Sequence, residues 1–568
     1  MVDVAAIVQR LSIEPENEEE FDKWIELEDA VSFLRDNAKR EELIVDASAK
    51  SVFMHTIVVP KSNVNPPDVG DLMSWNIDLQ SSWGIEVRHS RGAGESVSIV
   101  EPLSDAGSKS FQNGEKLVFS RTFEGRQGDK HYFEILQKFA HVFGLHLLPE
   151  RRAYCRLNKR GDIEDIVRMI DIPRRGGGWG TSIVTFDRHV LDEYLAMTDS
   201  VLVTVFDFTR FRLRSFGGWH NVGREGQFVQ DDLCYRSHIE SGHASYMRGA
   251  QIMRSATTNE AIIERLNPSV MKKREYASFI AVDFKNNVLR EISTAPDSIA
   301  NYFTKSDLPF EMSPAFFRPE VLLKYKGDSE KYRLEDRSIS CRNSWHLETY
   351  DINEAGQVHT YLIYLQRLPY DEQLYWKSYN EEPKAPISKR ALTTDFRGDW
   401  HNEYDPLASL KDFVIALDRA QIPWWTLRSE ELPPRVHYPV TTSQDEWSNE
   451  ILQLDQMLVE GFETRWLRKK AIELGRTPDP KFQSLKLIEE CFMGFGWEEG
   501  PARDVTAPFH KLHDLRSKLK GHASGDEATA IRIRVLAEHG SYIKHFRALC
   551  ASCDESLHTI AELFGGLR

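Results

Sequence analysis

The chain has 568 residues, of which 41% are hydrophobic, 28% charged and 11% aromatic. This composition excludes a disordered chain, which lacks the aromatic residues that build a core, and the length predicts a multidomain protein. Asp and Glu outnumber Lys and Arg by 87 to 72, so the formal net charge is −15. No overall positive field is therefore expected to attract nucleic acid or an anionic membrane.

Cysteine usage and hydropathy predict the compartment. Six cysteines are too few for a disulfide framework and indicate a reducing cytoplasm. The start of the chain has no basic segment followed by a long apolar run, so no signal peptide is expected. The longest apolar stretch, residues 201–208, is too short to cross a bilayer. We expect a soluble, cytoplasmic protein with no membrane contact.

Residues 1–440 are expected to form a mixed α/β (α+β) region. Apolar residues at helical spacing within 18–34 predict an amphipathic helix with an acidic outer face. Short β-branched and aromatic runs, bounded by Pro, Gly, Asp and Asn, predict strands at 51–59, 116–123, 201–208 and 277–284. Alternation of apolar and polar residues returns within 320–366 and ends in the run 358–365. Two subdomains that divide near 125–200 are one arrangement that this pattern allows.

The chain becomes helical after a proline-rich segment at 431–444, which predicts a linker. Apolar stripes predict one helix over 447–466 and a second over 482–492. A third is expected to begin at a Thr506 cap with Pro508 in its first turn, and a capping box at 524–527 is expected to open a long fourth helix that reaches Phe564. Residues 446–568 are thus predicted to be an all-α four-helix bundle.

Two glycine-rich loops, 174–181 and 214–226, combine arginine with tryptophan. Bare backbone N–H groups beside arginine can hold phosphate, and exposed tryptophan can stack on a base. The first loop lacks the Gly-Lys-Ser/Thr ending of a nucleotide-phosphate loop, so ordinary surface loops are the alternative. The candidate ligand- or trigger-binding residues are Arg174, Arg175, Trp179, Trp219 and Arg224.

No metal site and no cofactor are expected. His238, Glu240 and His243 offer ligands at short spacing, but zinc requires a more complete ligand set. Cys550 and Cys553 fall on the apolar stripe of the last predicted helix. Small buried cysteines are ordinary core residues in that setting.

The third predicted helix of the bundle carries the candidate catalytic residues His513, Arg516, Ser517, Lys520 and His522. Histidine can transfer the proton of a ribose 2′-hydroxyl near neutral pH, and arginine can hold a phosphate oxygen. On a straight helix Arg516 and His522 lie about 120° apart, so they converge only through a bend at Gly521 or through a second copy of the chain. The alternative is a solvated basic helix end.

The segment Leu515-Arg-Ser-Lys-Leu-Lys-Gly-His-Ala523 resembles the signature of the HEPN superfamily, particularly the ApeA-like HEPN proteins of prokaryotic defence. That signature is an arginine, four to six residues, then a histidine, and here five residues separate Arg516 from His522. The residue after the arginine is commonly Asn, Asp or His in the family and is Ser517 in this chain.

The resemblance implies a metal-independent endoribonuclease that acts as an antiphage or abortive-infection toxin. In such proteins two bundles pair to form one composite cleft, so a homodimer or higher homo-oligomer is expected. On that model His522 is the general acid/base and Arg516 binds the scissile phosphate. Ser517, His513 and Lys520 would assist them.

Local charge agrees with an RNA substrate for the bundle. Residues 501–568 contain ten Lys and Arg against eight Asp and Glu, an excess of positive charge in an acidic chain. Residues 1–440 would then sense a trigger, either a phage protein or a small molecule. The alternatives are a catalytically inactive HEPN-type module that binds RNA or protein, and an N-terminal enzyme that the bundle dimerises.

Overall fold

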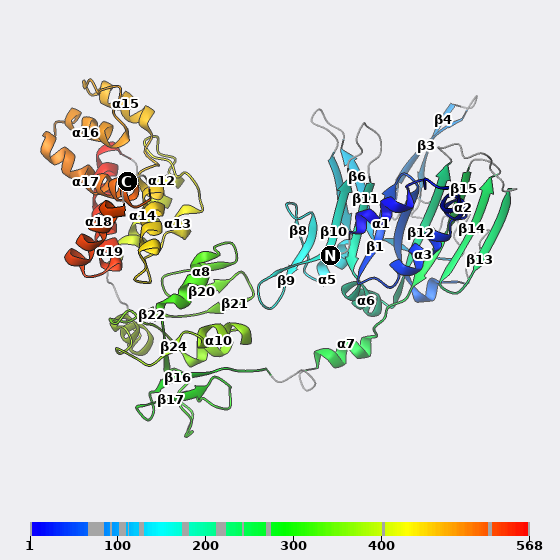
Figure 1. Cartoon of the computed structure of the whole chain (residues 1–568), viewed down its shortest axis with the longest axis horizontal. Helices are drawn as coiled ribbons and strands as arrows, with labels where there is room; N and C mark the ends of the chain where they lie inside the picture. Colours follow the sequence, from blue (N-terminus) through cyan, green and yellow to red (C-terminus); the bar gives the residue numbers. More distant parts are fainter. Residues whose placement is uncertain are drawn as a thin grey trace. The chain divides into compact units, whose positions relative to one another are not determined.

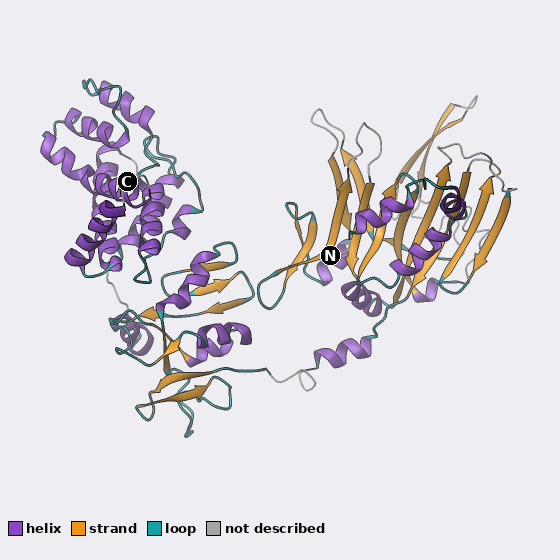
Figure 2. Cartoon of the chain, in the orientation of Figure 1, coloured by secondary structure: helices purple, strands orange, loops and turns teal. Residues whose placement is uncertain are grey.

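The structure, a computed structural model of the full chain, divides into two units (Figure 1). Unit 1 comprises Met1–Asn158 and Ile163–Lys273, and unit 2 comprises Lys159–Asp162 and Arg274–Arg568. The structure describes residues 3–65, 84–90, 94–100, 110–111, 113–123, 130–172, 181–211, 223–240, 244–267, 274–399, 404–520 and 525–565. Strands dominate unit 1, and helices fill the C-terminal part of unit 2 (Figure 2). A multidomain α+β protein with a C-terminal helical region is confirmed.

Unit 1 is built on one eleven-stranded antiparallel sheet in the order β13-β14-β15-β12-β2-β1-β11-β10-β9-β8, with β5 paired to β2. The strands are β1 (Glu42–Ala49), β2 (Val52–Pro60), β5 (Glu115–Lys116), β8 (His146–Leu148), β9 (Ala153–Leu157), β10 (Ile163–Ile172), β11 (Thr181–Asp187), β12 (Ser200–Phe211), β13 (Arg224–Val229), β14 (Leu233–Glu240) and β15 (Ala244–Met253). The predicted strands at 51–59 and 201–208 are neighbours at its centre. Described strands from before, within and after residues 125–200 belong to this one sheet, and the two units divide near residue 273 instead.

Helices cover both faces of this sheet because its strands are apolar on both sides. In β1, Ile44 packs with α1 (Val4–Leu11) and α3 (Glu28–Asn37), whereas Leu43 and Val45 pack with α5 (Gln137–Val142) and α6 (Arg188–Met197). The predicted helix within 18–34 is divided into α2 (Glu18–Ile25) and α3, since Leu27 takes a left-handed conformation with φ 65°. The remaining described elements are η1 (Lys61–Asn63), the hairpins β3 (Gly84–Ser90)–β4 (Gly94–Val100) and β6 (Val118–Phe123)–β7 (Lys130–Ile135), and α7 (Asn259–Leu266).

Unit 2 begins with two small sheets, ordered β17-β16-β18-β23-β22 with β24 on β18, and β19-β20-β21. Their bounds are β16 (Ser278–Asp283), β17 (Val288–Ser293), β18 (Pro314–Phe317), β19 (Tyr332–Leu334), β20 (Ile339–Cys341), β21 (Trp345–Leu347), β22 (Asp351–Ile352), β23 (Val358–Tyr361) and β24 (Asn380–Glu381). The helices among them are η2 (Pro319–Leu322), α8 (Leu323–Gly327), α9 (Leu362–Arg367), α10 (Tyr370–Lys377), α11 (Lys389–Ala391) and the π-helix η3 (Leu392–Arg397). The apolar run 358–365 is therefore half strand and half helix.

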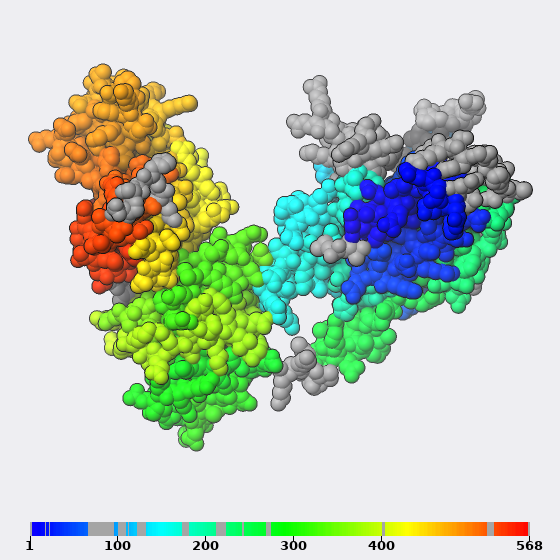
Figure 3. All heavy atoms as spheres, viewed as in Figure 1, coloured from blue at the N-terminus to red at the C-terminus, as the bar shows by residue number. Residues whose placement is uncertain are grey.

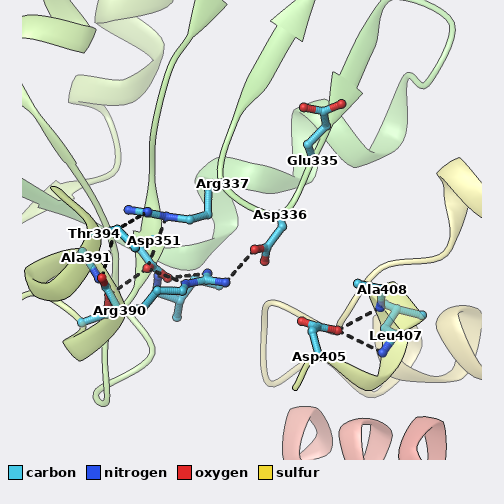
Figure 4. Close-up of polar contacts among 12 residues, drawn as sticks. Glu335, Asp336, Arg337, Asp351, Arg390, Ala391, Thr394, Asp405, Leu407 and Ala408 are labelled. Carbon is cyan, nitrogen blue, oxygen red and sulfur yellow. Dashed lines mark hydrogen bonds and ion pairs between the residues drawn. The ribbon is translucent and has the colours of Figure 1, made fainter. Parts of the chain in front are cut away.

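A network of ion pairs ties η3 to these sheets (Figure 4). Arg390 grips Asp351 of β22 with two hydrogen bonds of 2.9 and 2.8 Å, and its Nη1 reaches Asp336 at 2.6 Å. Arg337 donates to Asp395 of η3 at 2.7 Å. Burial would raise the pKa of Asp351, but the hydrogen bonds and charge of Arg390 outweigh it and lower that pKa. Asp351 therefore stays ionised at neutral pH, and the network holds the π-helical turn in place.

The helical region of unit 2 has one core that extends from Leu407 to Ala561. It consists of α12 (Pro406–Arg419), α13 (Leu432–Arg435), α14 (Gln444–Leu458), α15 (Thr464–Glu473), α16 (Ser484–Gly494), α17 (Glu499–Lys520), α18 (Gly525–His539) and α19 (Tyr542–Phe564). In the space-filling view the orange atoms of α15 and α16 lie at its surface (Figure 3). Because α12 packs on α19 and Val436 is fully buried, the core begins before the expected boundary at 446 and includes the predicted linker.

Three predicted helix boundaries are wrong, each for a local reason. The first helix ends at Leu458 because Gly461 packs against the Trp425 indole, and α15 follows separately. The third begins at Glu499, so Pro508 lies inside it rather than in its first turn. The fourth is interrupted at Gly540, whose φ is 75°, and Ser541 caps α19.

The last helix and its cysteines agree with the predicted pattern. Cys550 and Cys553 are fully buried on α19, as their position on the apolar stripe predicts. Among the described helices, none has the length and apolar composition needed to cross a membrane.

Candidate active site

The candidate catalytic side chains lie along the C-terminal half of α17. Phe509, Leu512 and Leu515 turn into the core, and the 3.6-residue period therefore leaves His510, His513 and Arg516 in a row on the adjoining face. His510 and His513 are about half exposed, with side-chain exposures of 40% and 51%, and Arg516 is more covered, at 29%.

Arg516 and His513 share one buried carboxylate. Asp455 on α14 is fully buried, and its Oδ2 accepts a hydrogen bond from Arg516 Nη1 at 2.8 Å. Its Oδ1 lies 3.2 Å from His513 Nδ1. Burial raises the pKa of Asp455, although the charges of His513 and Arg516 oppose that rise. Arg516 Nη1 also lies 2.9 Å from Glu460 Oε1, so two carboxylates fix the guanidinium.

A second buried carboxylate holds His510. Glu489 on α16 lies 3.0 Å from His510 Nε2, and it accepts hydrogen bonds from Thr506 at 2.9 Å and from Lys486 at 2.7 Å. Burial would raise the pKa of Glu489, but these hydrogen bonds outweigh it and the pKa is lowered. The side chain therefore remains an anion at neutral pH. The Thr506 hydroxyl supports the site rather than capping the helix.

A cavity of about 610 Å³ opens beside these residues. Pockets of this size hold small molecules or parts of larger ligands. The lining residues are Arg428, Val459, Glu460, Phe462, Thr464, Gln483, Ser484, Leu485, Lys486, His510 and His513. His510 and His513 on α17 therefore line the cavity, and so does Glu460, the carboxylate that pairs with Arg516.

The structure brings together only part of the predicted catalytic set. Arg516 and His513 meet at Asp455. Ser517 is exposed on α17, and Lys520 is the last residue of that helix. His522 lies outside the described residues.

Most of the predicted trigger-binding residues also fall outside the described part of the chain. These are Arg174, Arg175, Trp179 and Trp219. Arg224 is described, on β13, where its Nη2 lies 2.5 Å from Glu26 Oε1. This arginine therefore has a carboxylate partner within unit 1.

Sequence reasoning missed the carboxylates that organise the site. Asp455 lies on the same apolar stripe as Ile451 and Leu454, and Glu489 follows Ile488. An acidic residue on a predicted buried stripe indicates a buried charge with a partner, so this signal was present. The sequence carried no comparable signal for the cavity, which several helices and loops form together.

The arrangement can transfer protons and bind anions. Two carboxylate-held histidines and a fixed arginine suit acid–base chemistry at a phosphate. Within the described residues, no cluster of three or more His, Cys, Asp or Glu could hold a metal ion. No protein-family model, curated protein or solved structure matches this chain.

Proposed function

We propose that the C-terminal helical region is an HEPN-type, metal-independent endoribonuclease. The observation that carries this proposal is the anchoring of Arg516 and His513 by the fully buried Asp455, beside a cavity of about 610 Å³. A solvated basic helix end needs no such anchor. A fully buried carboxylate costs free energy in desolvation, and that cost is consistent with a need to hold the two side chains in one geometry.

In the proposed reaction the ribose 2′-hydroxyl attacks the adjacent phosphodiester. The bond from phosphorus to the 5′-oxygen breaks, which leaves a 2′,3′-cyclic phosphate and a free 5′-hydroxyl. His522 acts as general acid/base, and Arg516 stabilises the charge that develops on the phosphate oxygens. Asp455 positions Arg516, while Ser517, His513 and Lys520 assist as auxiliary residues.

The whole chain would then be an antiphage or abortive-infection effector. The N-terminal region would restrain the nuclease until a phage protein or small molecule is sensed, because constant RNA cleavage would kill the cell. Two HEPN-type bundles would pair into one cleft, since Arg516 and His522 lie about 120° apart on a straight helix.

The test is incubation of the purified full chain with total RNA in EDTA, followed by analysis of the product ends. We expect cleavage with cyclic-phosphate ends, and a loss of about 10²- to 10⁴-fold in Arg516→Ala and His522→Ala. Arg503→Ala, an exposed arginine on the same helix, and His346→Ala, an exposed histidine on β21, serve as matched controls.

Three outcomes would contradict the assignment. Strict dependence on Mg²⁺ would exclude the metal-independent reaction. Full activity in both site variants would move the chemistry elsewhere, for example into the N-terminal region with the bundle as a dimerisation module. RNA binding without any cleavage would favour an inactive HEPN-type binding module.

A further inference from the structure

The cavity beside α17 is lined by two kinds of residue. Lys486, Arg428 and the two histidines supply positive or protonatable groups, and Val459, Phe462 and Leu485 supply apolar surface. Nucleotides combine these two properties, because a charged phosphate is joined to a flat and largely apolar base. The lining therefore matches a nucleotide better than it matches an inorganic anion or an apolar ligand alone.

The histidines are arranged to present one ring nitrogen to a ligand. Glu489 engages His510 at Nε2, and Asp455 engages His513 at Nδ1. Both carboxylates are buried, whereas both imidazoles are about half exposed. No residue in the described part of the chain hydrogen-bonds the second ring nitrogen of either histidine. Each ring therefore has a fixed orientation and a nitrogen available to a phosphate oxygen.

Side-chain cations and two helix N-termini also line or adjoin the cavity. Glu460 in the lining pairs with Arg516 at 2.9 Å, and Asp455 shares the same guanidinium nitrogen at 2.8 Å. Lys486 and Arg428 also line the cavity, and each has a carboxylate nearby: Lys486 Nζ lies 2.7 Å from Glu489 Oε2, and Arg428 Nη1 lies 3.7 Å from Glu463 Oε1. Thr464 and Ser484, the first residues of α15 and α16, also line the cavity, so the positive ends of two helix dipoles contribute.

We propose that this cavity binds one phosphate-bearing nucleotide, with His510, His513 and Lys486 on its phosphate. This inference rests on the proposed function, which supplies the source of the nucleotide. The nucleotide would be a residue of the RNA substrate, next to the phosphodiester bond that is cleaved beside Arg516. A free nucleoside monophosphate has the same chemistry, and the two sources are separated below.

Binding is measured without turnover, so that it stands apart from the nuclease assay. The full chain carrying His522→Ala is titrated with a fluorescent single-stranded RNA 12-mer by anisotropy, and with the four nucleoside 5′-monophosphates by calorimetry. His510→Gln, Lys486→Gln and Arg428→Gln are each compared in that background. Lys469→Gln, on the exposed face of α15 and outside the cavity lining, is the matched control.

Each cavity variant is expected to weaken RNA binding by about tenfold, because each loses one charge-assisted hydrogen bond, while Lys469→Gln binds like the parent. Arg428 is half exposed, so its variant is expected to fold even if Lys486→Gln does not. Loss of monophosphate binding in the same variants with RNA binding unchanged would assign a free nucleotide as the occupant. The proposal would be overturned if the three cavity variants bound both the RNA 12-mer and the nucleoside monophosphates as tightly as the control Lys469→Gln does. A chain that binds nucleotide here but never cleaves RNA would refute only the nuclease.

Discussion

At the scale of single residues, Asp455 is the residue on which the candidate site depends. Its carboxylate is fully buried, yet it serves two partners on another helix. Glu460 contacts the same guanidinium nitrogen but is 38% exposed, so water can replace much of what it provides. The two carboxylates therefore share the partner Arg516 but differ in burial. Substituting each in turn measures what burial contributes to stability.

We expect Asp455→Asn to lower the free energy of unfolding by about 1–3 kcal/mol, because charge-assisted hydrogen bonds in a buried setting are lost. Glu460→Gln should cost less than about 1 kcal/mol, as is usual for a partly exposed pair. Urea denaturation of the full chain, followed by tryptophan fluorescence, measures both. Equal effects of the two substitutions would show that burial of Asp455 contributes nothing.

His545 on α19 is a second residue whose burial has a measurable consequence. It is only 1% exposed, and neither ring nitrogen has a hydrogen-bond partner among the described residues. Burial, with smaller contributions from the charges of Lys511 and His539, lowers the pKa of His545 to about 3. The native ring is therefore neutral, whereas the unfolded chain takes up a proton near pH 6.5.

The sign of the pH effect follows from proton uptake. Between pH 6.5 and pH 3 the unfolded state binds more protons at His545, so stability is lost as the pH falls and is fully present above pH 6.5. Because of this single residue, the free energy of unfolding is about 2 kcal/mol lower at pH 5 than at pH 8. We expect His545→Phe to reduce the loss between pH 8 and pH 5 by that amount in urea denaturation. The exposed His346→Phe should leave it unchanged, and an unaltered pH dependence in His545→Phe would contradict the argument.

At the scale of elements, the turn between α14 and α15 shapes the cavity. Val459, Glu460 and Phe462 all line it and flank Gly461. A Cβ atom at position 461 would lie 2.3 Å from Nε1 of Trp425, whose indole donates to the Leu458 carbonyl at 3.0 Å. The helix pattern over 447–466 is interrupted here because only a residue without a side chain can approach that indole.

Gly461→Ala is therefore expected to destabilise the helical region by about 1–3 kcal/mol through overpacking. Gly500→Ala, in the first turn of α17 with nothing within 4 Å of its new Cβ, is the control and should be neutral or slightly stabilising. Thermal unfolding of the two variants gives the comparison. A melting temperature for Gly461→Ala at or above that of the parent would exclude the steric argument.

At the scale of the whole molecule, the proposed cleft is shared by two chains. α18 exposes Ile533 at 65% and Leu536 at 43%, three residues apart on one helix. The helix that carries this apolar pair begins at Gly525, three residues after His522 in the sequence. The apolar face of this helix is therefore a surface through which residues 446–568 of two copies could associate.

Mixing Arg516→Ala chain with His522→Ala chain is expected to restore part of the RNA cleavage, because the shared cleft of a mixed dimer would keep one Arg516 and one His522, each from a different chain. Light scattering on the full chain measures the oligomeric state, and the RNA assay measures the restored activity. The control mixture combines Arg516→Ala with Arg516→Ala,His522→Ala and should stay inactive. A strictly monomeric chain that cleaves RNA would refute the composite cleft.

Local pattern determined part of the secondary structure and part of the core. Apolar periodicity predicted the strands β2 and β12, the helix α16 and the buried cysteines of α19, because these signals depend only on neighbouring residues. It also drew attention to α17, where His513 and Arg516 lie beside the stripe. The HEPN resemblance and the roles of Arg516 and His522 remain predictions.

Tertiary structure alone decided which partners these residues have. Asp455 is 58 and 61 positions from His513 and Arg516 along the chain, and the adjacency of β2 and β12 joins residues 148 positions apart at Thr56 and Thr204. Helix breaks at Gly461 and Gly540 likewise follow from close contact or left-handed backbone rather than from hydropathy. Periodicity identifies the buried face of an element. It cannot identify the partner of that face, because packing joins distant segments whose apolar stripes are interchangeable.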